Sequence, residues 1–284
     1  MDTAQPPPYA RMAATCSVAR PGHRYQALRA LTYGVTLLVA IAIPTLHWVK
    51  LDIPGHTYYL WGEPVPVLRA VKAFMLLTVS VLLLVLGSTY PFGRMFCGWS
   101  CPGGQLARLA RWLHHGWGRR HRLLRHPVAL AVAFAFALIA VNWFTHLSVL
   151  WHPGEAGFAG AWGWTAGLTA VFYVEGLWLG FFWCERICPY GWYLGIMAQR
   201  NRLRVVFHDP EGLCGECAAC AKACPVELDP RAPDFPAERC LTCGTCLDAC
   251  DAIFARREGT PPLGWAHRLE LRGPAAHPGP APRG

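Results

Sequence analysis

Residues 214–225 read CGECAACAKACP, and residues 240–251 read CLTCGTCLDACD. Both stretches space their cysteines as C-x2-C-x2-C-x3-C, and each cysteine of the second copy lies 26 positions after its counterpart in the first. The first copy contains Cys214, Cys217, Cys220 and Cys224, and the second contains Cys240, Cys243, Cys246 and Cys250. This duplicated cysteine module is the most specific signal in the sequence.

The spacing matches that of bacterial ferredoxins with two [4Fe–4S] clusters. Three cysteines in a tight loop reach three corners of one iron–sulfur cubane, whereas the fourth, one helical turn on, points away and ligates the other cluster. The predicted ligands are therefore Cys214, Cys217, Cys220 and Cys250 for a first cluster, and Cys240, Cys243, Cys246 and Cys224 for a second. Pro225 should end the short helix after the first loop. Asp251 stands where the second copy would usually have a proline.

The alternatives to iron–sulfur clusters are zinc and disulfides. Structural zinc sites use pairs of C-x2-C rather than a triple followed by x3-C, and disulfides are disfavoured in a reducing cytoplasm. The sequence shows no nucleophile–base motif, phosphate loop, dinucleotide fingerprint or C-x-x-C-H haem site beside the module. The module therefore favours electron transfer over substrate chemistry.

The rest of the chain is unusually apolar. Hydrophobic residues make up 54% and charged residues 15%, whereas an ordinary soluble domain carries about 25% charged residues. Long apolar runs precede the module, each with roughly the 20 residues that a membrane-spanning helix needs. We expect four spanning helices at about residues 28–49, 67–90, 127–151 and 161–183, of which the first is retained and is not a removed signal peptide. Buried core helices are the alternative interpretation.

The net charge of +9 comes from basic residues in the gaps between the apolar runs. They do not line one face, so we interpret them as topology signals and expect no nucleic-acid partner. Arginines gather before the first run, between the second and third, and after the fourth. The positive-inside rule then predicts a multi-pass protein of a bacterial inner membrane, with both termini in the cytoplasm.

The predicted fold class is mostly α: a four-helix transmembrane anchor with a C-terminal, cytoplasmic, two-cluster ferredoxin-like domain. The expected segments are a partly disordered cytoplasmic leader over residues 1–27 and a membrane domain over residues 28–205. The ferredoxin-like domain follows over residues 206–255, and a disordered tail over residues 256–284.

A second duplication lies in the membrane domain. Cys97-x3-Cys101-Pro recurs as Cys184-x3-Cys188-Pro at an offset of 87, and each copy is expected at the cytoplasmic end of a helix. Cysteines at i and i+4 share one helix face, so two facing pairs would offer four thiolates to a third iron–sulfur cluster or to a soft metal such as copper(I). The alternatives are a dithiol redox role and small buried residues that cap the helix ends.

Several polar side chains fall on or next to the apolar runs. His47, His146 and His152 lie toward the outer side and are candidates for a quinol pocket in which histidine takes protons. Glu175 lies inside the fourth run, where an acid is a functional candidate by default. The alternative is that these are interface histidines and a paired acid within the helix bundle.

Together, GRMFCGWSCP (93–102), CERICP (184–189) and the duplicated module resemble the polyferredoxin-type membrane iron–sulfur proteins, over roughly residues 28–255. This group includes the ferredoxin-type membrane subunit of periplasmic nitrate reductase systems and the methylamine-utilisation ferredoxin-type proteins. More distant members are the nitrous-oxide reductase regulator and the cytochrome oxidase accessory protein with cupric reductase activity. The length of the chain is closer to the first two types.

The resemblance implies an electron carrier or quinol dehydrogenase component rather than a stand-alone catalyst. Electrons would pass from quinol or a cytoplasmic donor toward a periplasmic oxidoreductase, of the nitrate reductase or methylamine dehydrogenase type, or toward its maturation. The implied partners are the lipid bilayer, quinol and another redox protein, either a periplasmic enzyme or a ferredoxin-type subunit. The alternatives are a metal-handling factor that binds or reduces copper for a respiratory oxidase, and a non-redox membrane anchor with structural clusters.

Overall fold

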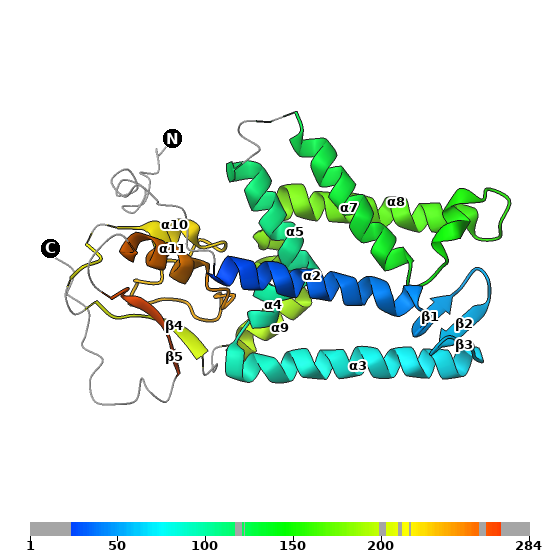
Figure 1. Ribbon diagram of the computed structural model, residues 1–284, viewed down its shortest axis with the longest axis horizontal. Helices are drawn as coiled ribbons and strands as arrows, with labels where there is room; N and C mark the ends of the chain where they lie inside the picture. Colours follow the sequence, from blue (N-terminus) through cyan, green and yellow to red (C-terminus); the bar gives the residue numbers. More distant parts are fainter. Residues whose placement is uncertain are drawn as a thin grey trace. The chain divides into compact units, whose positions relative to one another are not determined.

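The computed structural model describes residues 24–116, 121, 123–198, 203–209, 212–215, 217–255 and 260–267 (Figure 1). Most of the predicted leader and the end of the predicted tail lie outside these residues. The chain divides into two compact units. The cluster unit comprises Met1–Leu31, Gly87–Trp99 and Pro189–Gly284, and the helical unit comprises Thr32–Leu86 and Ser100–Cys188.

Two long helices run through parts of both units: α2 covers Arg24–Thr45 and α3 covers Val67–Phe92. At about 1.5 Å per residue, each is long enough to cross a hydrocarbon layer about 30 Å thick. Only 11% of the apolar stretch of each helix is buried inside the protein, and leucines such as Leu38 and Leu84 are 66% and 72% exposed. Both helices therefore present an apolar surface of the kind that lipid covers.

In the helical unit, α7 (Arg125–Val141) packs along α8 (Phe158–Val174) (Figure 1). The buried residues of α7 are Ala129, Ala133, Ala137 and Val141, and those of α8 are Ala161, Thr165 and Thr169. A spacing of four residues places these side chains on one face of each helix. Small residues at such a face let two backbones approach closely.

The predicted helix ends differ from the structure. The first helix ends at Thr45 rather than residue 49, and α7 ends at Val141 rather than residue 151. Beyond α7, the carbonyl oxygens of Trp143 and Phe144 accept hydrogen bonds from Leu51 and Ile53 at 3.1 and 3.0 Å. These carbonyls therefore pair with a strand that hydropathy does not reveal, and a short 3-10 helix, η2 (Leu147–Trp151), follows.

The fourth predicted helix is also interrupted. After α8, the chain forms a π-helical turn, η3 (Glu175–Leu179), and a second one, η4 (Trp183–Ile187). Gly180 lies between them with a φ of +50°, a conformation that glycine adopts without steric cost. Among the described helices, α2 and α3 are long and apolar enough to span a membrane, and α7 is a shorter apolar helix. The four-span anchor therefore stays a prediction.

A small antiparallel sheet follows α2, in the order β1 (Val49–Asp52), β2 (Thr57–Leu60) and β3 (Glu63–Pro64). Val49 pairs with Leu60, which in turn pairs with Glu63. Side chains alternate between the two faces of a strand, so Lys50 and Asp52 share one face of β1. Both are buried, at 2% and 5% exposure.

The next segments of the chain are short helices: α4 (Met95–Trp99), α5 (Pro102–Arg111) and the π-helical turn η1 (Trp112–Gly116). Further along, α9 (Pro189–Ala198) leads toward the cysteine module. Of these, α4 and α9 belong to the cluster unit, whereas α5 and η1 belong to the helical unit.

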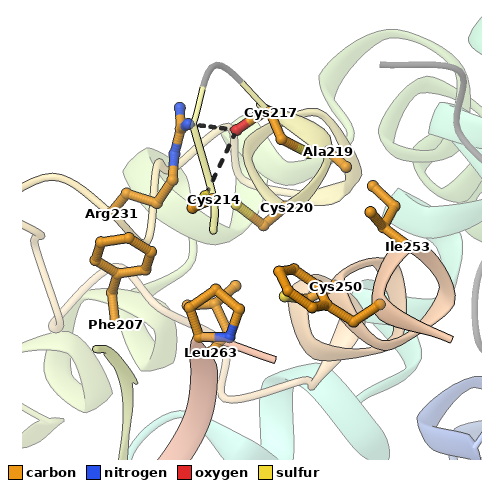
Figure 2. Close-up of a pocket in the computed structure, with 11 residues that line it drawn as sticks. Phe207, Cys214, Cys217, Ala219, Cys220, Arg231, Cys250, Ile253 and Leu263 are labelled. Atoms are coloured by element: carbon orange, nitrogen blue, oxygen red, sulfur yellow. Dashed lines mark hydrogen bonds between the residues drawn. The ribbon is translucent and has the colours of Figure 1, made fainter. Parts of the chain in front are cut away.

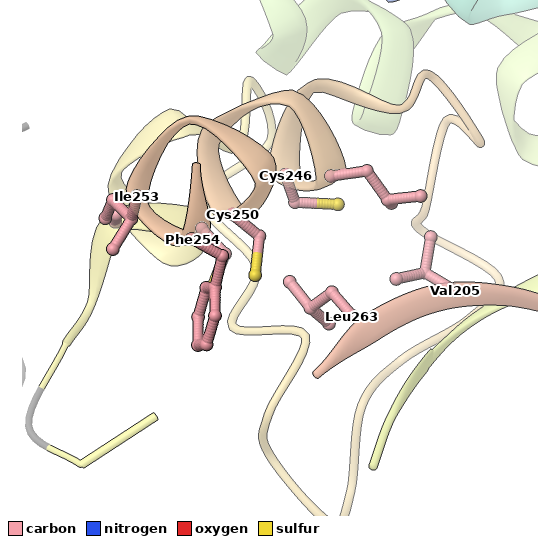
Figure 3. Close-up of a cluster of buried hydrophobic side chains, with 9 residues drawn as sticks. Val205, Cys246, Cys250, Ile253, Phe254 and Leu263 are labelled. Atoms are coloured by element: carbon pink, nitrogen blue, oxygen red, sulfur yellow. The ribbon is translucent and has the colours of Figure 1, made fainter. Parts of the chain in front are cut away.

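The cysteine module is built on α10 (Ala219–Ala223), α11 (Thr245–Phe254) and a two-stranded antiparallel sheet. The strands are β4 (Leu203–Phe207) and β5 (Leu263–His267), and Leu203 pairs with His267. Figure 3 shows Cys246 and Cys250 pointing from α11 toward Val205 and Leu263, in one buried cluster.

Ordered strands of the cysteine module extend beyond the predicted limits of the ferredoxin-like domain on both sides. Leu263–His267 forms β5 rather than part of a disordered tail, and β4 begins before residue 206. Leu263 is 5% exposed and packs in the same buried cluster as Phe254. The strand forms because pairing with β4 and burial of its side chains stabilise it. The Pro- and Gly-rich composition of this segment predicted disorder, because composition does not reveal a pairing partner about 60 residues earlier in the chain.

Candidate iron–sulfur centres

The four cysteines predicted to hold the first cluster line one pocket (Figure 2). Cys214 and Cys217 come from the loop before α10, Cys220 from α10 itself and Cys250 from α11. The remaining wall is formed by Phe207, Ala219, Arg231, Ile253, Phe254, Pro262 and Leu263. The pocket thus combines three cysteines of one copy with the fourth cysteine of the other.

The other four cysteines line a second pocket with the reciprocal pairing. Cys240, Cys243 and Cys246 come from the second loop and the start of α11, and Cys224 comes from the end of the first copy. Apart from these cysteines, the wall consists of Val205, Pro225, Val226, Leu228, Pro230, Phe235, Leu241 and Gly244. The second pocket is therefore walled by apolar side chains and backbone.

The proline after the first copy explains how Cys224 leaves its own loop. A residue before proline disfavours the helical conformation, and Cys224 is extended at the end of the five-residue α10, with φ −63° and ψ 123°. In the second copy Asp251 replaces the proline, and α11 continues to Phe254. The missing proline thus lengthens the second helix and leaves Cys250 on it.

Burial makes several of these thiols hard to ionise without a cation. It raises the pKa of Cys220 and of Cys240 to about 12 and that of Cys250 to about 11. Burial also raises the pKa of Cys246 well above its usual value, with like-charged neighbouring thiolates adding to the effect. Four thiolates in one pocket, two of them buried in each case, need a compensating positive charge, and an iron–sulfur core supplies it. The donor chemistry therefore fits such a core.

The first loop is held by acidic and basic residues close to it in sequence. Both oxygens of Asp209 accept backbone hydrogen bonds at 2.8 Å, one from Leu213 and one from Cys214. Arg231 donates to both oxygens of Asp229, at 2.9 and 2.7 Å. It also donates to the carbonyl oxygen of Cys217 (Figure 2). Burial works to raise the pKa of Asp229, but Arg231 outweighs it and lowers that pKa below its usual value.

The second loop is held by residues far from it in sequence, all within the cluster unit. Arg29, which is 6% exposed, donates to the carbonyl oxygen of Cys243, and Trp99 Nε1 donates to that of Thr242 at 3.0 Å. Gly98 lies so close that a Cβ atom there would be 2.5 Å from the carbonyl oxygen of Leu241. Sequence reasoning missed these residues, although an arginine at the edge of an apolar run is itself a signal.

The C-x3-C-P motifs do not have the predicted geometry. Cys97 lies on α4 and Cys184 on η4, and both are buried. Their partners Cys101 and Cys188 are extended, with ψ of 128° and 116°, because each precedes the proline that starts the next helix. The prediction that each pair shares one helix face is therefore wrong, but both copies bend at the same position. Cys97 belongs to the cluster unit and the other three to the helical unit.

Two of the predicted histidines come together in the helical unit. The rings of His47 and His146 are 5.3 Å apart, and Tyr59 lies 4.6 Å from His47. Lys50 Nζ lies 3.4 Å from His146 Nδ1, and Asp52 Oδ2 lies 3.8 Å from His146 Nε2. Burial, with the charge of Lys50 adding to it, lowers the pKa of both histidines, which lie beyond the ends of α2 and α7. Sequence reasoning missed Lys50, Asp52 and Tyr59 as members of this group, because their strands, β1 and β2, are too short to show a clear periodic pattern.

The other two predicted polar residues have different partners. His152 is 61% exposed and lies 3.8 Å from Glu155. Glu175 is buried at 5% exposure against the start of α5, where a Cβ atom on Gly103 would be 2.8 Å from its Oε1. Glu175 is therefore not among the contacts of the histidine pair, whereas His152 is linked to that pair through Glu155, whose charge also acts on His146.

Comparison with known proteins adds a family. A model described as a 4Fe-4S binding domain matches residues 73–122 and 161–205. Each matched segment contains one C-x3-C-P motif, and the duplicated cysteine module lies after both. No solved structure matches the chain.

Several curated relatives carry matching names. The ferredoxin-type protein NapH of Escherichia coli (strain K12) is 27% identical over 55% of this chain and 59% of its own length. The methylamine utilization ferredoxin-type protein MauN of Methylorubrum extorquens (strain AM1) is 33% identical over 46% of this chain and 47% of its own. The nitrogen fixation protein FixG of Rhizobium meliloti (strain 1021) is 25% identical over 81% of this chain and 53% of its own length. The chain thus matches less than two thirds of the length of each of these three relatives. It is a ferredoxin-type iron–sulfur protein related to NapH, MauN and FixG.

Proposed function

We propose that this chain transfers electrons through two [4Fe–4S] clusters held by the duplicated cysteine module. The observation that carries the proposal is the crossed lining of the two pockets, each with three cysteines of one copy and the fourth of the other. A [4Fe–4S] cluster, when bound, accepts and releases one electron at a time. The thiolates hold it, Arg231 offsets negative charge at the first pocket, and the apolar walls keep water out.

The crossed assignment gives a sharp test. Anaerobically purified protein should contain about eight iron and eight sulfide atoms per chain from this module. Cys250→Ser should remove the first cluster, and Cys224→Ser should remove the second, although each serine lies in the opposite copy. Iron and sulfide analysis with EPR spectroscopy checks both variants. Zinc in place of iron would overturn the proposal. Loss of the second cluster in Cys250→Ser and of the first in Cys224→Ser would overturn it as well.

The chain is also proposed to be a multi-pass protein of a bacterial inner membrane, with both termini in the cytoplasm. The support comes from the two long helices, whose apolar side chains are mostly exposed. The protein should stay with the membrane after an alkaline carbonate wash, and reporters fused to either terminus should be active in the cytoplasm. Release by the wash would refute membrane insertion, and a periplasmic reporter signal would refute the topology.

The C-x3-C-P cysteines are proposed to hold a further centre, either a third cluster or a soft metal. The support is the description of the matching family model, whose two segments each contain one motif, and the bend that both motifs share. If the centre is a cluster, Cys101→Ser should remove about four iron atoms and leave the module's clusters intact. If it is copper, the same variant should lose copper binding and keep its iron. Unchanged iron and copper would argue against a metal centre.

The electron donor is proposed to be a quinol, and the acceptor a periplasmic oxidoreductase of the nitrate reductase or methylamine dehydrogenase type. Oxidation of a quinol releases two protons with its two electrons, and the neutral His47–His146 pair with Asp52 supplies proton acceptors. A quinol analogue should reduce the clusters in membranes, and His146→Gln should slow this reduction but not reduction by dithionite. Clusters that stay oxidised with the analogue would refute the quinol step.

A further inference from the structure

The start of α2 is capped by a residue of the cysteine module. The first backbone N–H groups of a helix have no partner within the helix, and the first turn of α2 contains no acidic residue of its own. Tyr25 N and Gln26 N donate instead to the two oxygens of Asp248, at 3.0 and 2.9 Å. Asp248 is 2% exposed and lies on α11 between Cys246 and Cys250.

Tyr25, at the same helix end, packs closely against the second loop. Gly244, which precedes α11, has a φ of +72°, and a Cβ atom there would lie 2.6 Å from the ring of Tyr25. The hydroxyl of Tyr25 accepts a hydrogen bond of 2.9 Å from Trp265 Nε1. Only glycine therefore fits between the loop and the tyrosine.

One turn further along α2, Arg29 is aimed at the backbone of a predicted cluster ligand. Its Nη1 donates to the carbonyl oxygen of Cys243, and its side chain is buried at 6% exposure. A buried guanidinium keeps its charge. Its field is weakly screened, because water and salt have little access to it.

A cubane held by four thiolates is anionic and gains a further negative charge on reduction. Nearby positive charge and hydrogen bonds favour the reduced form. We infer that Arg29 is a positioning residue of the second cluster, which holds Cys243 in place through its carbonyl oxygen and raises the reduction potential of that cluster. The inference rests on the proposed function and assigns α2 a role in tuning a redox centre.

The test is a potentiometric titration of the full-length, cluster-loaded protein, followed by EPR spectroscopy. Arg29→Met should shift one of two one-electron transitions to lower potential. Arg231→Met, the counterpart at the first pocket, should shift the other transition. Arg24→Met removes an exposed charge from the first turn of α2, and it should move neither transition because solvent screens that charge.

Arg29→Lys keeps the charge but loses the planar fork, and it should shift the same transition by less. If Arg29→Met fails to retain its second cluster, Arg29→Lys provides the test. A small downward shift of that transition in Arg29→Lys supports the inference, and an unchanged potential overturns it. An Arg29→Met protein with unchanged transitions, or a shift of the transition that Arg231→Met moves, also overturns it. Iron counting on the wild type separates these outcomes from failure of the proposed function.

Discussion

The two cysteine loops share one spacing, but they are supported in opposite ways. The first loop is held by neighbours in sequence: Arg231 reaches Cys217 across 14 positions, and Asp209 reaches Leu213 across four. The second loop is held across 214 positions by Arg29 and across 143 by Trp99. Duplication of a ligand pattern therefore does not duplicate its environment, because the second loop depends on segments from the far end of the chain.

The pockets differ in charge as well. The first has the guanidinium of Arg231 in its wall, whereas the wall of the second is apolar apart from its cysteines. Arg29 contacts the second loop through the carbonyl oxygen of Cys243. For Cys240, burial raises the pKa to about 12, and the charge of Arg94 opposes the effect only in part. We therefore expect that substituting a residue that hydrogen-bonds to one loop will affect the cluster of that loop and leave the other cluster unchanged.

The largest expected effect is at Gly98. A Cβ atom there would meet the carbonyl oxygen of Leu241 at 2.5 Å and the Cβ of Cys243 at 3.1 Å, so Gly98→Ala must displace the second loop. We expect loss of the second cluster, or about half of the module's iron, with the first cluster retained. Iron analysis and EPR spectroscopy measure this. Gly87→Ala is the matched control, since nothing lies within 4 Å of a Cβ atom at Gly87. Full iron in Gly98→Ala would show that the second loop does not need this contact.

A smaller effect is expected at Asp248 and Asp209, the two aspartates that accept backbone hydrogen bonds near the loops. Asp248→Asn weakens the hydrogen bonds to Tyr25 and Gln26, and Asp209→Asn weakens those to Leu213 and Cys214. Each should lower the free energy of unfolding by about 1 kcal/mol, as for the loss of a helix cap. Denaturant titrations that follow each cluster separately should show Asp248→Asn acting on the second cluster and Asp209→Asn on the first. Equal effects of either variant on both clusters would remove the distinction between local and distant support.

The last effect is no larger near neutral pH, and it disappears in acid. The pKa of Asp229 is below its unfolded value, because Arg231 outweighs burial. The stability that it contributes is therefore present above the unfolded pKa and is lost as the pH falls through the folded pKa. Asp229→Asn should lower the free energy of unfolding by about 1 kcal/mol near neutral pH, and this difference should vanish in acid. Denaturant unfolding across the acid range measures it, and a difference that is constant with pH would contradict the assignment.

Pattern reasoning succeeded where a local constraint decides the geometry. The proline at 225 ends α10 and turns Cys224 away from its loop, and the aspartate at 251 lets α11 continue. It failed for the C-x3-C-P motifs, where the prediction used the helical spacing of the cysteines and left out the effect of the following proline on the backbone before it. The same rule, applied evenly, would have predicted the bend at Cys101 and Cys188.

The remaining misses depend on partners that lie elsewhere in the chain. Leu263–His267 is a strand because β4 lies beside it, and α7 stops at Val141 where the following carbonyls pair with β1. Short strands of four or five residues carry little periodicity of their own.

The sequence by itself determined the ligand spacing, the family resemblance and the apolar character of the long helices, because each is a property of residues within short segments. Only the tertiary structure decided that Arg29, Trp99 and Asp248 enclose the second loop and that His47 meets Lys50 and His146. Such contacts join residues far apart along the chain, and their formation depends on long-range packing that no local pattern encodes.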